Sequence, residues 1–242
     1  MNPLEDVTLK KFITSLLPLG TLDWLARNHQ YALLRFREPI AKAFHCNFYN
    51  ELKFHKTHWM GVQLLKCPFD LWVYQEILHE HQPDLVIETG TFQGGSAFYM
   101  SNIMDLIGKG RIVTIDIDEK PNRPQHPRIT YITASSTAPE TIEKVKGIIQ
   151  PGEKVMVILD SYHGRDHVLR EMELYHGFVS GGCYMIVEDT NVNNHPVEPS
   201  FGPGPMEAVD LFMGKNRQFV IDAECEKYDV SMNPRGYLKK VA

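Results

Sequence analysis

From residue 85 onward, short apolar runs rich in β-branched residues alternate with stretches that are compatible with helices. The first four runs are each followed by such a stretch. This order is typical of a parallel sheet with helices on both faces, because parallel neighbours need a crossover connection. Ligands of such sheets bind at the carboxyl ends of the strands. The expected strands are residues 85–88, 111–118, 129–133, 155–160, 184–188 and 219–223.

Residues 1–84 follow a different pattern, which is helical and rich in aromatic side chains. We expect an N-terminal helical cap over residues 1–84 and one α/β domain over residues 85–242. Asp70 is expected to cap a helix that enters this domain. The stretch 190–205 is rich in Asn, Pro and Gly and is expected to be a lid over the site, with Pro205 opening the next helix.

The composition limits the classes of partner and the cellular compartment that we expect for this protein. The chain has 25 Lys and Arg against 30 Asp and Glu, which gives a formal net charge of −5 and no general signature of a nucleic-acid partner. The four cysteines are far apart, which favours reduced thiols in a cytoplasm. We find no apolar run long enough to span a membrane and no signal-peptide cleavage pattern. We therefore expect a cytoplasmic protein with neither nucleic acid nor membrane as partner.

The end of the first strand has the features of a cofactor cradle. A glycine turn follows the strand and leads into a helix, so that a ligand can approach the backbone closely. The spacing Gly-x3-Gly-Gly lacks the dinucleotide fingerprint. Glu88 offers a carboxylate to a cationic ligand, and Asp116, at the next strand end, is placed to accept hydrogen bonds from ribose hydroxyls. A plain tight turn is the alternative, and the two acids at successive strand ends argue against it.

These features resemble the class I S-adenosylmethionine-dependent methyltransferases. The resemblance implies a Rossmann-like fold with a mostly parallel seven-stranded sheet and S-adenosylmethionine as cofactor. It implies that Glu88 holds the methionine amino group, Ser96 the carboxylate and Asp116 the ribose. The remaining expected cofactor contacts are Gly90, Thr91, Gly94, Ser135, Ser136 and Asp160.

Three acids follow the fourth and fifth expected strands. Asp160 ends one strand and is followed by His163, and Glu188 and Asp189 end the next. Like charges packed together are costly unless a cation compensates them, and all-oxygen ligation selects a hard cation such as Mg²⁺. The alternative is that Asp160 caps a helix while the other two acids are solvated. A zinc-protease pattern is not favoured, because Gly164 stands where a Glu is needed.

Five motifs in order narrow the resemblance. They are Glu-Thr-Gly-Thr-x-x-Gly-Gly-Ser, Thr-Ile-Asp-Ile-Asp, Leu-Asp-Ser-x-His, Val-Glu-Asp-Thr-Asn and Gly-Pro-Gly-Pro-x-Glu-Ala-Val. Over about residues 57–215 the chain resembles the cephalosporin hydroxylase family, which includes rhamnosyl and macrolide-sugar O-methyltransferases. The spacing also matches catechol-type enzymes, although Glu188–Asp189 replaces Asp–Asn and His163 replaces Lys. The resemblance implies a homo-oligomer and a small-molecule acceptor, either a sugar or an antibiotic-like natural product.

The leading hypothesis is methyl transfer to a substrate hydroxyl. Mg²⁺ held by Asp160, Glu188 and Asp189 would lower the hydroxyl pKa, and His163 would accept the proton. Two alternatives stay open. One is a part in cephalosporin-type hydroxylation or methoxylation, although the two-His-one-carboxylate pattern of non-haem iron is missing. The other is a non-catalytic cofactor-binding module, which has no need of His163.

Overall fold

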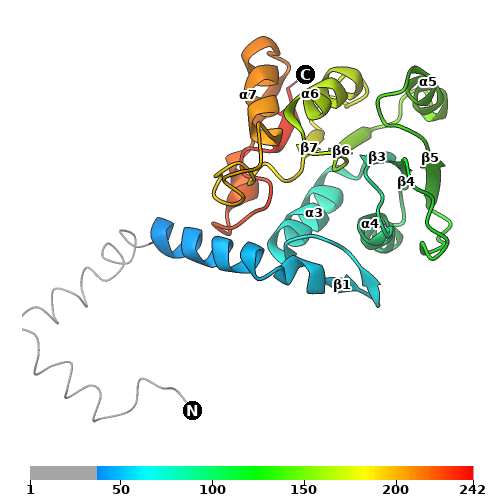
Figure 1. Ribbon diagram of the computed structural model, residues 1–242. Coiled ribbons are helices and arrows are strands. Elements are labelled where there is room, and N and C mark those ends of the chain that lie inside the picture. The colour runs from blue at the N-terminus through cyan, green and yellow to red at the C-terminus, as the bar shows by residue number, and fades with distance from the viewer. Residues whose placement is uncertain (1–36, 242) are drawn as a thin grey trace, which may run out of the picture. The chain divides into compact units, whose positions relative to one another are not determined.

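The computed structural model of the chain describes residues 37–241, of which residues 37–50 are helical (Figure 1). A compact unit formed by Phe44–Ala242 contains the whole sheet. Residues 1–36 of the expected cap lie outside the described residues, and the division at residue 84 stays a prediction, although the compact unit already begins at Phe44. Among the helices described, none has the length and apolar character to cross a membrane.

The sheet has seven strands in the order β5-β4-β3-β6-β7-β9-β8. β5 to β7 run parallel to one another, whereas β9 is antiparallel to both β7 and β8. The mostly parallel seven-stranded sheet predicted from the sequence is therefore confirmed. Its strands are β3 (Leu85–Thr89), β4 (Arg111–Asp116), β5 (Ile129–Thr133), β6 (Val155–Leu159), β7 (Tyr184–Val187), β8 (Phe219–Ile221) and β9 (Tyr237–Lys240).

Helices cover both faces of this sheet. Figure 1 shows α3 and α4 on one face and α5, α6 and α7 on the other. Their bounds are α3 (Pro68–His81), α4 (Gly95–Ile107), α5 (Pro139–Ile148), α6 (Arg165–Tyr175) and α7 (Pro205–Lys215). Shorter elements are η2 (Lys53–Lys56), the antiparallel pair β1 (His58–Trp59) and β2 (Val62–Gln63), and η3 (Ala223–Glu226).

The position of the site follows from the strand order. β3, β6 and β7 are buried at every position, as expected for strands that have helices on both faces. β4 and β5 lie on one side of β3, and β6 and β7 lie on the other. The connections after β3 and β6 therefore diverge, which leaves a crevice at the carboxyl ends of these two strands.

Several local expectations need adjustment. β4 ends at Asp116, so the next two residues of the expected strand belong to a loop, and Ile117 is 72% exposed. β9 was not expected, since its sequence ends in two lysines. Pro205 is the first residue of α7, as predicted.

Asp70 does not cap α3, contrary to the sequence-based expectation. The N-cap residue is Cys67, and Asp70 is buried one turn into the helix. Its carboxylate accepts hydrogen bonds from Ser231 Oγ (2.6 Å), Tyr237 OH (2.9 Å) and the backbone N–H of Met232 (2.8 Å). Asp70 therefore ties the loop before β9 to α3.

Candidate active site

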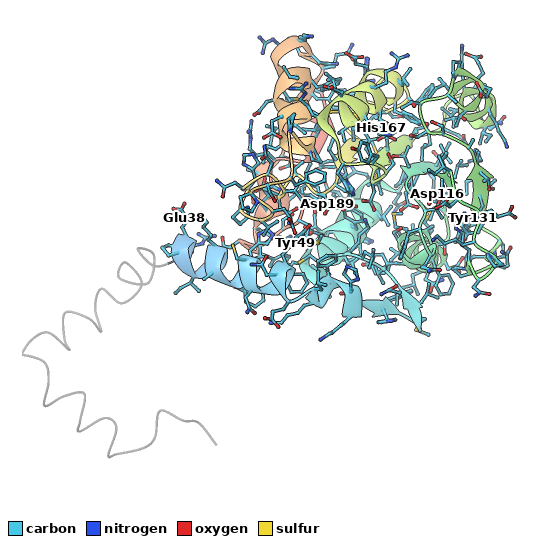
Figure 2. The ribbon with its side chains drawn as sticks, in the orientation of Figure 1. Glu38, Tyr49, Asp116, Tyr131, His167 and Asp189 are labelled. Carbon is cyan, nitrogen blue, oxygen red and sulfur yellow. The ribbon has the colours of Figure 1, made fainter. Side chains whose placement is uncertain are left out.

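A cavity of about 590 Å³ opens at the carboxyl ends of the strands. Figure 2 labels Tyr49, Asp116, His167 and Asp189, which lie on its wall. Residues 190–205, the expected lid, do not line the cavity, so their closure over the site stays a prediction. Most of the site residues predicted from the sequence do line it: Gly90, Thr91, Ser96, Asp116, Ser135, Ser136, Asp160, His163 and Asp189. Glu88, Gly94 and Glu188 are not among its lining residues.

The loop between β3 and α4 passes very close to other backbone segments. Gly90 has a φ of +85°, and a Cβ atom there would lie 1.8 Å from the carbonyl oxygen of Asp160. At Gly95 a Cβ would lie 2.2 Å from the carbonyl oxygen of Gln63. Only glycine fits at either position. The first turn of α4 consequently reaches the cavity wall, where its free backbone N–H groups can receive an anionic group.

Glu88 lies directly behind this wall. It is completely buried, and its two carboxylate oxygens accept hydrogen bonds from Ser96 Oγ (2.5 Å) and Thr114 Oγ1 (2.6 Å). Burial raises the pKa of Glu88, and the nearby charge of Lys66 opposes that rise. Ser96 thus separates Glu88 from the cavity, and the expected contact of Glu88 with a methionine amino group stays a prediction.

Asp116 anchors the glycine loop. Its Oδ2 accepts hydrogen bonds from the backbone N–H groups of Thr91 (3.0 Å) and Phe92 (2.7 Å), and Arg123 Nη2 lies 3.2 Å from the same oxygen. The backbone N–H of Asp118 donates to Oδ1 at 2.9 Å. Asp118 also lines the cavity, and the second acid of the motif Ile-Asp-Ile-Asp was the signal for it.

The ends of β6 and β7 bring two of the predicted metal ligands together with the predicted base. The side-chain ligand atoms of Asp160, His163 and Asp189 all lie within 4.8 Å of one another. His163 Nε2 is 3.1 Å from Asp189 Oδ2. Burial raises the pKa values of Asp160 and Asp189, and the charge of Glu188 raises both further. Asp160 and Asp189 are partly buried and lie close together, so a cation between them would favour their ionised forms.

Glu188 is not a member of this group. Lys66 Nζ lies 2.7 Å from Glu188 Oε1 and 2.6 Å from Asp160 Oδ2, and the Tyr74 hydroxyl also donates to Glu188 Oε1. Burial alone would lower the pKa of Lys66, but the two carboxylates outweigh it and raise that pKa. Sequence reasoning missed both Lys66 and Tyr74, although both lie within residues 57–215, over which the family resemblance extends.

The backbone explains why adjacent acids diverge. Asp189 has a φ of +54°, in the left-handed region, so the chain turns sharply after Glu188. The backbone N–H of Asp189 donates to Asn233 Oδ1 at 3.0 Å, which holds this turn. The carboxylate of Glu188 consequently reaches Lys66, whereas Asp189 itself lines the cavity.

A divalent cation fits the group formed by Asp160, His163 and Asp189. Two carboxylates and an imidazole nitrogen converge there on one side of the cavity. The carboxylates suit Mg²⁺, and the imidazole extends the range to transition metals. Lys66 already neutralises part of the charge of Asp160 and Glu188, so the structure gives Glu188 a partner that is not a metal.

The cavity wall carries a second polar cluster. Ser161 Oγ donates to Glu171 Oε1 at 2.7 Å and lies 3.0 Å from His167 Nε2. The hydrogen bond with Glu171 raises the pKa of His167. Ser136 Oγ is 3.5 Å from the same imidazole, so one of the two serines predicted near an adenine ring contacts a histidine that was not predicted to be a site residue.

The comparisons with known proteins agree with this geometry. The family model described as rhamnosyl O-methyltransferase/CmcI matches residues 52–241. The chain belongs to this family. It is 41% identical over 228 residues to the rhamnosyl O-methyltransferase of Mycobacterium tuberculosis (strain ATCC 25618 / H37Rv), with 91% of this chain and 93% of that protein covered. It is 40% identical over 197 residues to the rhamnosyl O-methyltransferase of Mycobacterium leprae (strain TN), covering 79% and 84%.

A solved member of the rhamnosyl O-methyltransferase/CmcI family has the same fold. The structure of CmcI with Mg and SAM superposes with a TM-score of 0.60 at 22% identity and covers 78% of both chains. The family membership predicted from the five motifs is confirmed, and the chain is an enzyme of the O-methyltransferase class.

Proposed function

We propose that this enzyme transfers a methyl group from S-adenosylmethionine to a hydroxyl group of a small molecule, with a sugar as the acceptor class and Mg²⁺ as cofactor. One observation carries the proposal. A single cavity is lined both by the glycine loop and Asp116 and by Asp160, His163 and Asp189. The names of the mycobacterial relatives support a sugar hydroxyl as the acceptor.

Asp160 and Asp189 would hold the divalent cation. The cation, when bound, supplies Lewis-acid chemistry that lowers the pKa of a coordinated hydroxyl. Glu188, the third ligand expected from the sequence, is proposed to act together with Lys66, since its Oε1 is already engaged by that ammonium group and by Tyr74.

His163 is the proposed general base. Its Nε2 lies beside Asp189 on the cavity wall, where it can accept the proton of an acceptor hydroxyl. The deprotonated oxygen then forms a bond to the methyl carbon as the bond from that carbon to sulfur breaks, which leaves a thioether and a proton on His163. Asp189 stabilises the resulting imidazolium through its charge.

The part of the cavity wall that is formed by the glycine loop, α4 and the acids after β4 would position the methyl donor. The free N–H groups of α4 suit the methionine carboxylate, and Asp116 and Asp118 suit the ribose hydroxyls. Ser135, Ser136 and His167 would surround the adenine. Positioning of this kind accounts for much of the rate enhancement in group transfer.

Two competing functions have less support. Non-haem iron oxygenases use two His and one carboxylate, whereas Asp160, His163 and Asp189 provide one His and two carboxylates. A non-catalytic cofactor-binding module does not need a histidine 3.1 Å from one of the acids. The homo-oligomeric state and the cytoplasmic location stay predictions.

The test uses the full chain, S-adenosylmethionine, Mg²⁺ and a panel of methyl glycosides. We expect chelation of divalent cations to abolish methyl transfer and His163→Ala to reduce it at least about 100-fold. S-adenosylhomocysteine affinity should be retained. His126→Ala is the matched control, because His126 Nε2 pairs with Asp105 Oδ2 at 2.9 Å and does not line the cavity.

Each result has a defined meaning. Unchanged turnover of His163→Ala would remove His163 from the mechanism. A loss of Mg²⁺ affinity in this variant would make His163 a metal ligand. Tight binding of S-adenosylhomocysteine without methylation of any acceptor would favour the binding-module alternative.

A further inference from the structure

Glu171 is a buried acid to which the proposed function gives no role. It lies on α6, its side chain is 1% exposed, and it does not line the cavity. Ser161 Oγ donates to its Oε1 at 2.7 Å, and within residues 37–241 no group hydrogen-bonds its Oε2. A buried carboxylate that is short of partners is costly unless a positive charge stands beside it. The imidazole of His167 is the candidate for that charge, since its Nε2 is 3.5 Å from Glu171 Oε1.

The two residues form a pair that reaches from the interior to the cavity. They are four positions apart on α6, which places their side chains on the same side of the helix. His167, labelled in Figure 2, is part of the cavity wall, whereas Glu171 is completely buried. The hydrogen bond with Glu171 raises the pKa of His167, and burial of the imidazole opposes that rise. The pair therefore favours an imidazolium group at the cavity wall.

The other titratable neighbours of this imidazole in the described part of the chain are tyrosines. The Tyr162 ring, in the loop after β6, meets the imidazole edge-on, with centroids 5.8 Å apart. Tyr175, further along α6, donates its hydroxyl to the carbonyl oxygen of Ser136 at 2.7 Å. Ser136 itself follows β5 and brings a hydroxyl group 3.5 Å from Nε2. Glu171 therefore supplies the charge that acts on His167.

Ser161 determines which ring nitrogen is left for a ligand. A hydroxyl group has one proton and a carboxylate can only accept, so the Ser161 proton goes to Glu171. Ser161 Oγ must then accept a hydrogen bond from His167 Nε2, which lies 3.0 Å away. The protein thus holds the Nε2–H group, whereas Nδ1 carries a proton in the imidazolium form and a lone pair in the neutral form.

We propose that His167 recognises a ring nitrogen of adenine through its Nδ1–H group, and that Glu171 is the positioning residue that maintains this donor. The ring nitrogens N1, N3 and N7 of adenine are acceptors, so a charged imidazole can donate to one of them. A neutral imidazole with its proton on Nε2 would instead oppose that nitrogen with a lone pair. Hydrogen bonds from a charged donor are stronger than neutral ones. The inference rests on the proposed function for the place of the adenine beside Ser135, Ser136 and His167.

The test measures ligand binding to the full chain by calorimetry. The probes are S-adenosylhomocysteine and three analogues of it, in each of which a C–H group replaces N1, N3 or N7 of the adenine. Near pH 6 we expect at least one analogue to bind at least about tenfold more weakly than S-adenosylhomocysteine. This preference should be lost as the pH rises to about 9, because the imidazolium then releases its Nδ1 proton. The ratio of two Kd values cancels the titration of groups that all the probes share.

Two variants separate recognition from a structural role. His167→Leu should bind S-adenosylhomocysteine as weakly as that analogue, whose own affinity should stay unchanged. Glu171→Gln keeps the size of the side chain and an acceptor for Ser161 but removes the charge, so the preference should be lost at a lower pH than in the wild type. A merely structural role of Glu171 would change the affinities for all four probes equally and leave the pH dependence of their ratio as it is.

The matched controls are His126→Leu and Asp105→Asn. These two residues also form a histidine–acid pair, with Nε2 and Oδ2 2.9 Å apart, and neither lines the cavity. Both controls should keep the preference of the wild type and its pH dependence.

The outcomes distinguish this contact from the proposed function. The expected preference in an enzyme that methylates no acceptor would sustain the contact and count against the proposed function. Methyl transfer by an enzyme that binds all four probes equally at every pH would overturn the contact alone. A preference that survives in His167→Leu, or a pH dependence that is unaltered in Glu171→Gln, would also overturn it. Where a variant does not fold, the pH dependence of the wild-type preference decides.

Discussion

Lys66→Met tests whether an internal ammonium group shapes the charge of the site. Lys66 is buried, and its Nζ contacts Asp160 Oδ2 at 2.6 Å and Glu188 Oε1 at 2.7 Å. Removal of one partner of a buried ion pair costs about 3–5 kcal/mol. Because Lys66 has two partners, we expect the upper end of that range. For a chain of this size the loss corresponds to a decrease in Tm of about 10–20 °C.

The same substitution should strengthen metal binding. Two unit charges 4 Å apart interact by about 4 kcal/mol at an effective dielectric constant of about 20. A third of that energy already corresponds to about tenfold in affinity. We therefore expect Lys66→Met to bind Mg²⁺ at least tenfold more tightly than the wild-type enzyme, and Mg²⁺ to raise the Tm of the variant more than that of the wild type.

The measurements are thermal unfolding with and without Mg²⁺ and calorimetric titration of the cation. Lys109→Met is the matched control. Lys109 Nζ is 2.9 Å from Asp84 Oδ1, but its side chain is 45% exposed, so the cost should be below about 1 kcal/mol. Unchanged stability together with unchanged Mg²⁺ affinity in Lys66→Met would refute the reasoning.

Two further predictions concern stability. Burial raises the pKa of Asp70 to about 7 from its ordinary 3.8. The folded protein therefore keeps this proton while the unfolded chain releases it, and the free energy of unfolding should fall as the pH rises from about 4 to about 7, by up to about 4 kcal/mol. The free energy of unfolding of Asp70→Asn, measured with urea, should lack this pH-dependent component. Identical slopes of that free energy against pH in the variant and in the wild type would contradict the prediction. Gly90→Ala places a Cβ 1.8 Å from the carbonyl oxygen of Asp160 and should lose S-adenosylhomocysteine binding. Gly108→Ala is the control, because Gly108 has a similar φ of +82° but a Cβ there would have no atom within 4 Å. This variant should lose only about 1–2 kcal/mol of the free energy of unfolding. Equal losses of S-adenosylhomocysteine binding in the two variants would exclude the close approach as the cause.

The sequence predicts the parallel part of the fold because that part is locally encoded. β-branched runs of four to six residues specify β3 to β7 without reference to distant residues. A helix follows β3, β5, β6 and β7, whereas β4 leads directly to β5, so the helix expected after the second run is absent from the described stretch between them. β9 is different. Its residues Tyr237–Lys240 alternate weakly and end in two lysines, and its antiparallel pairing with β7 depends on contacts across the sheet.

The candidate site is predicted only in part from the sequence. Asp160 and Asp189 end neighbouring parallel strands, so their convergence follows from the topology alone. Lys66 could not be placed in this way, because 94 residues separate it from Asp160 and no spacing rule joins them. Tyr49 and Phe54 also line the cavity and were not predicted to do so, because aromatic residues in a helical segment more often belong to a core.

These unpredicted contacts share one origin, the buried face of α3 and the residues just before it. Lys66, Asp70 and Tyr74 are spaced four residues apart, which brings side chains to one side of a helix. Lys66 and Tyr74 hold Glu188 directly, and Asp70 holds the C-terminal loop that in turn accepts the backbone N–H of Asp189. Both acids at the end of β7 are therefore oriented by protein groups, without the help of a cation. The metal would then bind a preformed group with a fixed charge, which is why removal of Lys66 should change its affinity more than its position.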